Sequence, residues 1–249
     1  MKEEGVCKLC NKKRILVEGH IYPNFFRKWI LKENKNIKSF YYRYLEDGEW
    51  QITKTQNTLT FLLFCNECDN EILSKIEGSF KKSCFEQILK GEFNFENEYS
   101  QLIQKFSASI AFRMLYGMKI FDPKNFHELG PELLFHATQA AEEWRCIINQ
   151  DGNSYCYYNL YFDYLFTYNN QSSSAQWFFQ KILLKYNGKV LLAVLCGPLI
   201  ILGSLNPELS FTQDIVKTVV KILFNYQTEK CQLIGPPYII LGSNPIVNM

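Results

Sequence analysis

Two Cys-x-x-Cys pairs, far apart in the chain, are the residues best suited to bind a metal. Cys7 and Cys10 form the first pair, and Cys65 and Cys68 form the second. Each pair presents two sulfurs on one tight turn, and four thiolates can close a tetrahedral cage around zinc. The spacing therefore predicts one structural zinc site. In zinc-finger peptides such a site contributes about 10 to 16 kcal/mol, which is effectively folding energy.

Disulfides or free buried thiols are the alternative use of these four cysteines. No charged segment followed by an apolar segment comes after Met1, so the sequence predicts a cytoplasmic protein, and disulfides are rare in that compartment. The other cysteines are single, and we expect them to pack in the core as small apolar side chains. They are Cys84, Cys146, Cys156, Cys196 and Cys231.

His20 lies in the short segment Gly19-His20-Ile21-Tyr22-Pro23, between the two pairs. An imidazole has an unperturbed pKa of about 6.5, so it can accept a proton from water near neutral pH. It can equally hydrogen-bond a buried backbone group and have only a structural role. Both interpretations are open at this point. His127 and His136 have no cysteine or paired carboxylate at ligand spacing, and we expect them to have packing or surface roles.

The elements that would position these residues follow from hydrophobic periodicity and turn signals. Residues 1–80 predict a zinc module whose last helix carries the second cysteine pair. A hairpin is predicted around Asp47-Gly48, because aromatic residues flank that dipeptide on both sides. The predicted elements are a strand at residues 14–17, a helix at 23–32, the hairpin at 38–54, a strand at 58–64 and a helix at 66–80.

Residues 81–249 predict a second, mainly helical domain. Apolar residues recur at helical intervals over residues 99–118 and 129–148, and shorter amphipathic helices are predicted at 175–186 and 212–226. Two similar segments, residues 197–207 and 235–245, each open on a Gly-Pro turn and predict two short hairpins that share a small sheet. The expected fold class is therefore α+β.

The order of these motifs resembles the HNH, or ββα-metal, nucleases that carry a zinc-bound treble clef. The resemblance covers about the first third of the chain. It implies a treble-clef module with a structural zinc, His20 as the general base, and Asp69 on the helix as ligand of a catalytic Mg²⁺ or Mn²⁺. Asn57 is the candidate for the family's middle asparagine. Two positions differ from the family pattern: Asp69 replaces a histidine, and Gly19 replaces an aspartate or histidine.

The chain also resembles uncharacterised bacterial proteins that join these motifs to a helix with a Ser-x-x-x-Arg sequence. Here that sequence runs from Ser109 to Arg113, inside an apolar stretch. This likeness brings no assigned activity with it. An arginine in such a place is either a buried ion-pair member or a phosphate contact, and we predict the ion pair.

Charge and hydropathy bear on the partners. The net charge is +2, but basic residues gather on both sides of His20 and alternate with aromatic residues such as Phe25, Phe26 and Trp29. This mixture suits nucleic acid, DNA or RNA, although a solvated helix with an apolar face would show the same pattern. We expect no membrane span, because the longest apolar run, residues 190–202, is shorter than about 20 residues.

The sequence thus predicts an HNH-like metal-dependent nuclease, or a nuclease-derived subunit, in a setting such as bacterial anti-phage defence. We expect the helical region to dock on a protein partner or on a second copy of the chain. The alternative, from a different class, is a non-catalytic zinc-stapled binding or scaffold subunit of a complex.

Overall fold

The computed structural model describes most of the chain and is the structure discussed below. The described residues are 3–33, 40–46, 49–55, 60–93, 100–121, 126, 130–149, 157–164, 179–207, 209–223 and 231–241.

The described strands form two antiparallel sheets. The small sheet has the order β1-β2-β5, and its strands are β1 (Glu3–Val6), β2 (Lys13–His20) and β5 (Thr60–Cys65). The large sheet has the order β4-β3-β10-β7-β8-β9-β6. Its strands are β3 (Phe40–Glu46), β4 (Glu49–Thr55), β6 (Leu160–Tyr164), β7 (Phe179–Tyr186), β8 (Lys189–Cys196), β9 (Leu199–Ser204) and β10 (Cys231–Leu241).

Helices connect and cover these sheets. The run from Cys68 to Lys90 is helical throughout and ends at Gly91, whose φ of 71° is the left-handed conformation typical of a helix end. Its pieces are the π-helical η1 (Cys68–Leu73), α2 (Ser74–Phe80), the π-helical η2 (Lys81–Phe85) and α3 (Glu86–Lys90). The other helices are α1 (Asn24–Glu33), α4 (Ser100–Phe121), α6 (Gly130–Asn149) and α7 (Gln213–Leu223).

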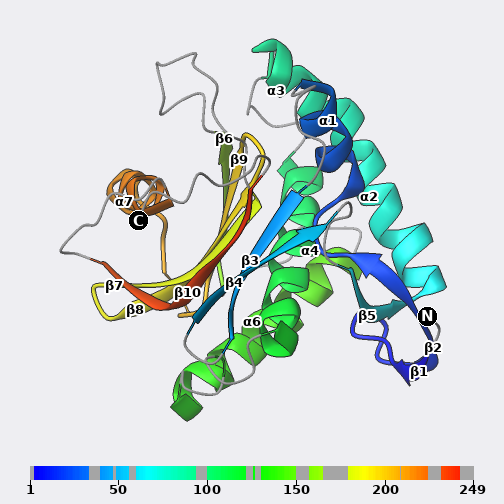
Figure 1. Cartoon of the computed structure of the whole chain (residues 1–249), viewed down its shortest axis with the longest axis horizontal. Coiled ribbons are helices and arrows are strands. Elements are labelled where there is room, and N and C mark those ends of the chain that lie inside the picture. Colours follow the sequence, from blue (N-terminus) through cyan, green and yellow to red (C-terminus); the bar gives the residue numbers. More distant parts are fainter. Residues whose placement is uncertain are drawn as a thin grey trace.

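The β8–β9 part of the large sheet is covered on both faces. In Figure 1, α7 lies on one side of it, and α4 and α6 lie on the other. On β8, Leu191 and Ala193 pack in the cluster with α7, whereas Leu192 and Val194 pack in the cluster with α4. A strand that is buried on both faces has apolar residues at every position. This explains why residues 190–202 form a continuous apolar run.

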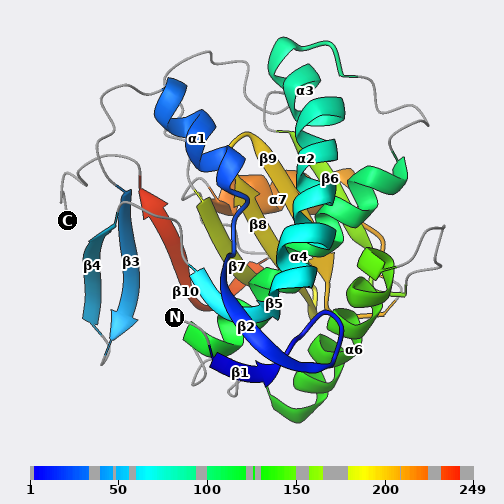
Figure 2. The same ribbon diagram turned by 90° about the vertical axis from the view of Figure 1, so that its right-hand side faces the viewer.

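The small sheet and α2 lie on the far side of α4 from the large sheet, and Figure 2 shows them in front of it. One hydrophobic core runs across this boundary, from Leu9 in the first cysteine pair to Leu205 after β9. Phe80 of α2 stacks on Phe106 of α4, with ring centroids 3.6 Å apart. The N-terminal segment is therefore packed tightly against the rest of the protein.

Several predicted elements are confirmed, and the mixed α and β character is confirmed with them. β3 and β4 pair in antiparallel fashion, with Glu46 opposite Glu49, and the predicted turn at Asp47-Gly48 lies outside the described residues. The turn at Gly197-Pro198 joins β8 to β9, with Cys196 opposite Leu199. The helices predicted near residues 23–32, 66–80, 99–118, 129–148 and 212–226 are present as α1, the η1–α2 run, α4, α6 and α7.

Two predictions for the second half of the chain are wrong. Residues 179–186 of the predicted helix at 175–186 form β7, which is hydrogen-bonded to β8 on one side and β10 on the other. Pairing with a neighbour on each side is tertiary context that outweighs a weak amphipathic pattern. Among the described residues from 81 onward, strands β6 to β10 accompany helices α3, α4, α6 and α7.

In the described part of residues 235–245, the second Gly-Pro turn is also absent. Gly235, Pro236 and Pro237 lie inside the single strand β10. The pairing register with β7 shifts between Ile234 and Tyr238. Proline cannot donate a ladder hydrogen bond, so it is tolerated within a sheet at such an irregularity.

Among the described residues, no helix is long and apolar enough to cross a membrane.

Gly203→Ala is expected to destabilise the protein by about 1 to 3 kcal/mol through overpacking. A Cβ atom at Gly203 would lie 2.7 Å from Cη2 of the Trp144 ring, which is fully buried and rigidly held. The matched control is Gly78→Ala, since nothing lies within 4 Å of a Cβ there. Because Gly78 is exposed within α2, that variant should gain up to about 1 kcal/mol. Denaturant titration of both variants measures the difference.

Candidate metal centre and neighbouring polar cluster

The four predicted cysteines converge. Cys7, Cys10, Cys65 and Cys68 bring their sulfurs within 4.8 Å of one another. Cys10 Sγ lies 4.0 Å from Cys65 Sγ, which is far beyond a disulfide bond length of about 2.05 Å. Four sulfurs about 2.3 Å from a central zinc lie about 3.8 Å apart. The donor set and its spacing therefore fit a metal such as zinc, and the disulfide alternative is wrong for these residues.

The first pair is held in a compact turn between β1 and β2. The Cys7 N–H donates to the Lys12 carbonyl at 3.0 Å, and the Asn11 N–H donates to the Cys7 carbonyl at 2.9 Å. Asn11 has a φ of 57°, in the left-handed region that asparagine tolerates better than most residues. This turn curls the chain so that both sulfurs point to the same side.

The second pair lies where β5 meets the helical run. Leu16 of β2 is opposite Cys65 of β5, so the register of the small sheet carries the two pairs to the same end. The Cys65 N–H donates to Cys7 Sγ at 3.3 Å. A hydrogen bond of this kind to sulfur favours the thiolate form that a metal requires.

The electrostatics of the four-cysteine cluster favour a bound cation. Burial raises the pKa of Cys68, and its hydrogen bond with Cys65 and the charge of Cys7 raise it further. Burial also raises the pKa of Cys65. At Cys7, burial raises the pKa, but backbone hydrogen bonds from Cys10 and Cys65 outweigh that effect, and the pKa is lowered overall. Thiolates this close repel one another, so a central cation is needed for all four to ionise.

The turn that carries Cys7 and Cys10 is anchored to α6. Leu9 is fully buried, and its carbonyl accepts hydrogen bonds from Asn149 Nδ2 at 3.3 Å and from Arg145 Nη1 at 3.5 Å. The Lys8 ammonium lies 5.9 Å from the centre of the Tyr116 ring on α4. The candidate metal centre is therefore part of the core of the protein.

Asp69 lies against Gly19, at the end of β2 that carries His20. His20 is the last residue of β2 and is half-buried, and Asp69 is the second residue of η1. Asp69 Oδ1 lies 2.7 Å from the place where a Cβ of residue 19 would be. Glycine at position 19 therefore leaves room for the Asp69 carboxylate against the end of β2. Two predicted site residues from distant parts of the chain are thus brought together.

The surroundings of Asp69 raise the pKa of its carboxyl group. Burial raises the pKa of Asp69, the charge of Arg113 lowers it, Glu77 raises it, and His20 lowers it. The net effect is an increase above the usual value of 3.8. The charges that shift the pKa of Asp69 belong to His20, Glu77 and Arg113, and Asp69 itself directly follows Cys68 of the sulfur cluster.

Arg113 is the buried ion-pair member that the sequence predicts. Its Nη2 lies 2.7 Å from Glu77 Oε1, and the two side chains are 3% and 19% exposed. Its Nη1 donates to the His20 carbonyl at 3.0 Å. The guanidinium thus links α4, α2 and the end of β2.

A π-helical turn lets the neighbouring side chains of Cys68 and Asp69 face different surroundings. The Ser74 N–H donates to the Asp69 carbonyl five residues earlier, which is the hydrogen bond of a π-helix. Within this turn Cys68 belongs to the sulfur cluster, and Asp69 lies against Gly19. Sequence periodicity alone misses this turn, because it assumes a regular helix.

The remaining predicted residues separate into two groups. Asn57 and His127 lie outside the described residues. His136 on α6 is half-buried, and its Nδ1 lies 2.9 Å from the Tyr158 hydroxyl.

The aromatic residues of α1 belong to the core. Phe26 is fully buried, and its ring contacts that of Phe85 edge-on, with centroids 5.1 Å apart. Lys28 and Lys32 on the same helix are exposed. This helix is therefore a solvated helix with an apolar face, and Phe26 offers no surface for a base to stack on.

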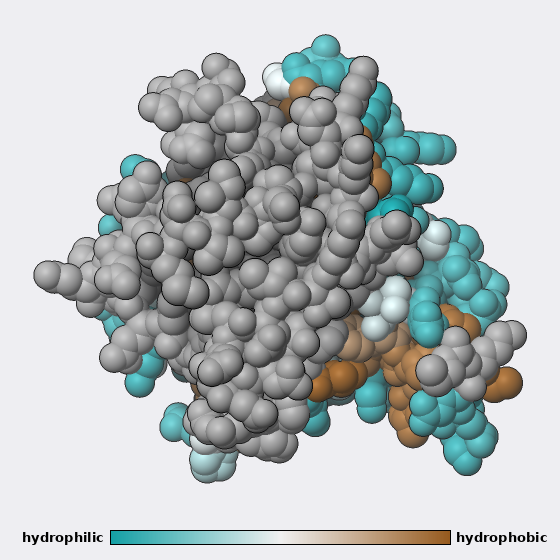
Figure 3. All heavy atoms as spheres, in the orientation of Figure 1, coloured by the Kyte–Doolittle hydropathy of each residue, from teal (hydrophilic) through white to brown (hydrophobic). Residues whose placement is uncertain are grey.

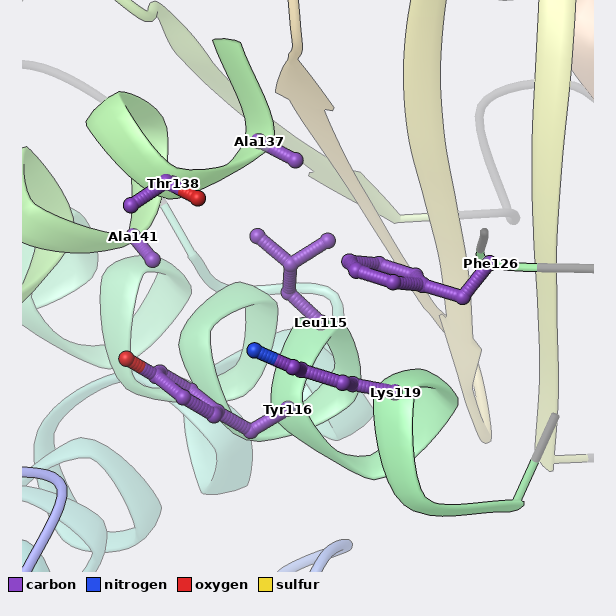
Figure 4. Close-up of a pocket in the computed structure, with 7 residues that line it drawn as sticks. All are labelled: Leu115, Tyr116, Lys119, Phe126, Ala137, Thr138 and Ala141. Carbon is purple, nitrogen blue, oxygen red and sulfur yellow. The ribbon is translucent and has the colours of Figure 1, made fainter. Parts of the chain in front are cut away.

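A small pocket between α4 and α6 lies apart from these residues. Leu115, Tyr116 and Lys119 line it from α4, and Ala137, Thr138 and Ala141 line it from α6 (Figure 4). None of the candidate site residues lines this pocket, so it adds nothing to the site.

Apolar surface gathers near the small sheet. Figure 3 shows it at the lower right, in the region of β1 and β2. On these strands Val6 is 49% exposed and Ile15 is 59% exposed. Val6 directly precedes Cys7, whereas His20 lies at the other end of β2.

No protein-family model, curated protein or solved structure matches the chain. The function must therefore be argued from the residues of the site.

Proposed function

We propose that the protein is an HNH-like metal-dependent nuclease that hydrolyses phosphodiester bonds in DNA or RNA. The observation that carries this proposal is the position of Asp69, which follows Cys68 of the four-cysteine cluster and lies against Gly19, the residue before His20. Two antiparallel strands, β2 and β5, lead directly into the helical run that carries Asp69. This order supports a ββα-metal unit with a treble-clef zinc centre, in which α1, β3 and β4 fill the connection between the strands.

The chemistry assigns separate tasks to the two residues. His20, at the end of β2, would take the proton from the attacking water, a step that contributes about 10²- to 10⁴-fold in rate. Asp69 would hold a divalent cation such as Mg²⁺, which stabilises charge on the phosphate when it is bound. Glu77 is committed to its ion pair with Arg113. The protein would therefore supply one carboxylate ligand. Water and substrate oxygens would complete the coordination shell, as is common for Mg²⁺.

Exposed cations at the start of β2, the end opposite His20, are compatible with an anionic substrate. Lys12 and Arg14 are exposed on the hairpin whose second strand ends at His20. Such side chains contribute sequence-independent affinity for phosphates that falls with increasing salt.

Asp69→Asn is expected to reduce cleavage by about 100-fold or more, because the amide keeps the shape but weakens the hold on a hard cation. The assay follows DNA and RNA substrates with Mg²⁺ or Mn²⁺, and with neither ion. The matched control is Glu71→Gln, an exposed carboxylate two residues further along η1. Cleavage that is equal in Asp69→Asn and wild type would refute the role of Asp69.

A second candidate function is a zinc-stapled scaffold without catalysis. The anchoring of Leu9 by Arg145 and Asn149 favours it, because the metal centre is part of the core. Absence of cleavage by the wild type under every metal condition, together with full zinc occupancy, would support this candidate and contradict the nuclease.

A further inference from the structure

One face of α4 is shaped to receive the end of β2. Ser109, Arg113 and Gly117 follow one another at intervals of four residues, so they lie on the same side of the helix. A Cβ at Gly117 would lie 2.6 Å from Ile21 Cδ1, so glycine allows Ile21 to approach α4 closely. One turn earlier, Arg113 reaches the His20 carbonyl. This face therefore contacts His20 and the residue after it.

The guanidinium of Arg113 uses most of its donors in this place. Nε donates to the Ser109 carbonyl at 3.1 Å, and Nη2 donates to Ser109 Oγ at 3.3 Å and to Glu77 Oε1 at 2.7 Å. Ser109 Oγ in turn donates to the Phe106 carbonyl at 2.8 Å. Hydrogen bonds to its own helix hold the planar guanidinium in one orientation. This planar fork distinguishes arginine from lysine.

We infer that Arg113 is a positioning residue, which sets His20 relative to Asp69 by joining the end of β2 to the helical run that carries Asp69. The inference rests on the proposed function for its effect on catalysis. Nη1 fixes the His20 peptide group, and Nη2 fixes Glu77, two turns after Asp69. The two elements that would hold the base and the metal ligand are therefore braced against each other through one side chain.

Substrate is not expected to touch Arg113, because the side chain is 3% exposed and its charge is already paired. Loss of the brace should therefore lower kcat and leave KM nearly unchanged. A misplacement of about 1 Å can cost on the order of 100-fold in rate.

Two variants test this inference without leaving a buried charge unpaired. Arg113→Lys keeps a cation beside Glu77 but lacks the planar fork. The double variant Arg113→Met with Glu77→Gln removes both charges together. The matched control, Lys81→Met with Glu86→Gln, makes the same replacements at an ion pair whose side chains are about half exposed.

The readout that does not depend on cleavage is the imidazole signal of His20. The chain has three histidines, so a histidine-labelled NMR spectrum has three ring signals, and His20→Ala assigns one of them. We expect both Arg113 variants to fold with zinc bound, to shift the His20 signal, and to lose about 100-fold in kcat at constant KM. The control should change neither quantity.

An unchanged His20 signal and unchanged kcat in a folded variant would overturn the inference. Failure of both variants to fold would also overturn it, because Arg113 would then be required for folding and not for placing His20. If the wild type cleaves nothing but the His20 signal still shifts, the positioning role holds and the nuclease proposal fails.

Discussion

Cys65→Ala is expected to remove zinc and unfold the N-terminal segment. The four sulfurs lie within 4.8 Å of one another around a centre that a single ion can fill. A structural zinc site of this type is worth about 10 to 16 kcal/mol. That equals the whole stability of a typical domain, about 5 to 15 kcal/mol. Because Leu9 and Cys68 are also part of the main core, the damage should spread beyond the cluster.

The measurement is the zinc content per chain together with thermal unfolding. Wild type should hold about one zinc, and Cys65→Ala should hold none and melt more than about 10 °C lower. The matched control is Cys84→Ala, because Cys84 is equally buried but does not belong to the sulfur cluster. Burial raises the pKa of Cys84 to about 12, so it stays a neutral thiol. Full zinc binding by Cys65→Ala would contradict the assignment of the centre.

His20→Ala is expected to lower phosphodiester cleavage by about 10²- to 10⁴-fold, the contribution of a general base. The half-buried ring lies at the end of β2, and His20 lowers the pKa of Asp69. The backbone carbonyl that Arg113 holds is still present in this variant, so the fold should persist. Single-turnover cleavage of DNA and RNA with Mg²⁺ measures the effect on the chemical step.

The control for this variant is His136→Ala. His136 is also half-buried, but it lies on α6 against the Tyr158 hydroxyl. It should keep wild-type cleavage, and both variants should keep one zinc. Equal cleavage by His20→Ala and wild type would leave His20 without a catalytic role.

The metal centre could be predicted from the sequence because its chemistry is local. Each Cys-x-x-Cys pair needs only one turn to place two sulfurs, and few uses other than metal binding explain two such pairs. The Gly197-Pro198 turn was predictable for a similar reason, because the residue types fix the backbone conformation.

Other features depend on contacts between distant segments. β7 is a strand because β8 and β10 pair with it, and nothing within residues 179–186 reveals those partners. The position of Asp69 depends on a π-helical turn and on the space above Gly19, which a regular helix does not predict. The sequence indicated Arg113 as a buried ion-pair member, but its partner Glu77 became evident only in the fold.

X-ray absorption at the zinc edge of the purified protein tests the central claim most directly. The account predicts about one zinc per chain with four sulfur neighbours at about 2.3 Å. A zinc bound by nitrogen or oxygen atoms in place of Cys7, Cys10, Cys65 or Cys68, or a protein without zinc, would contradict it.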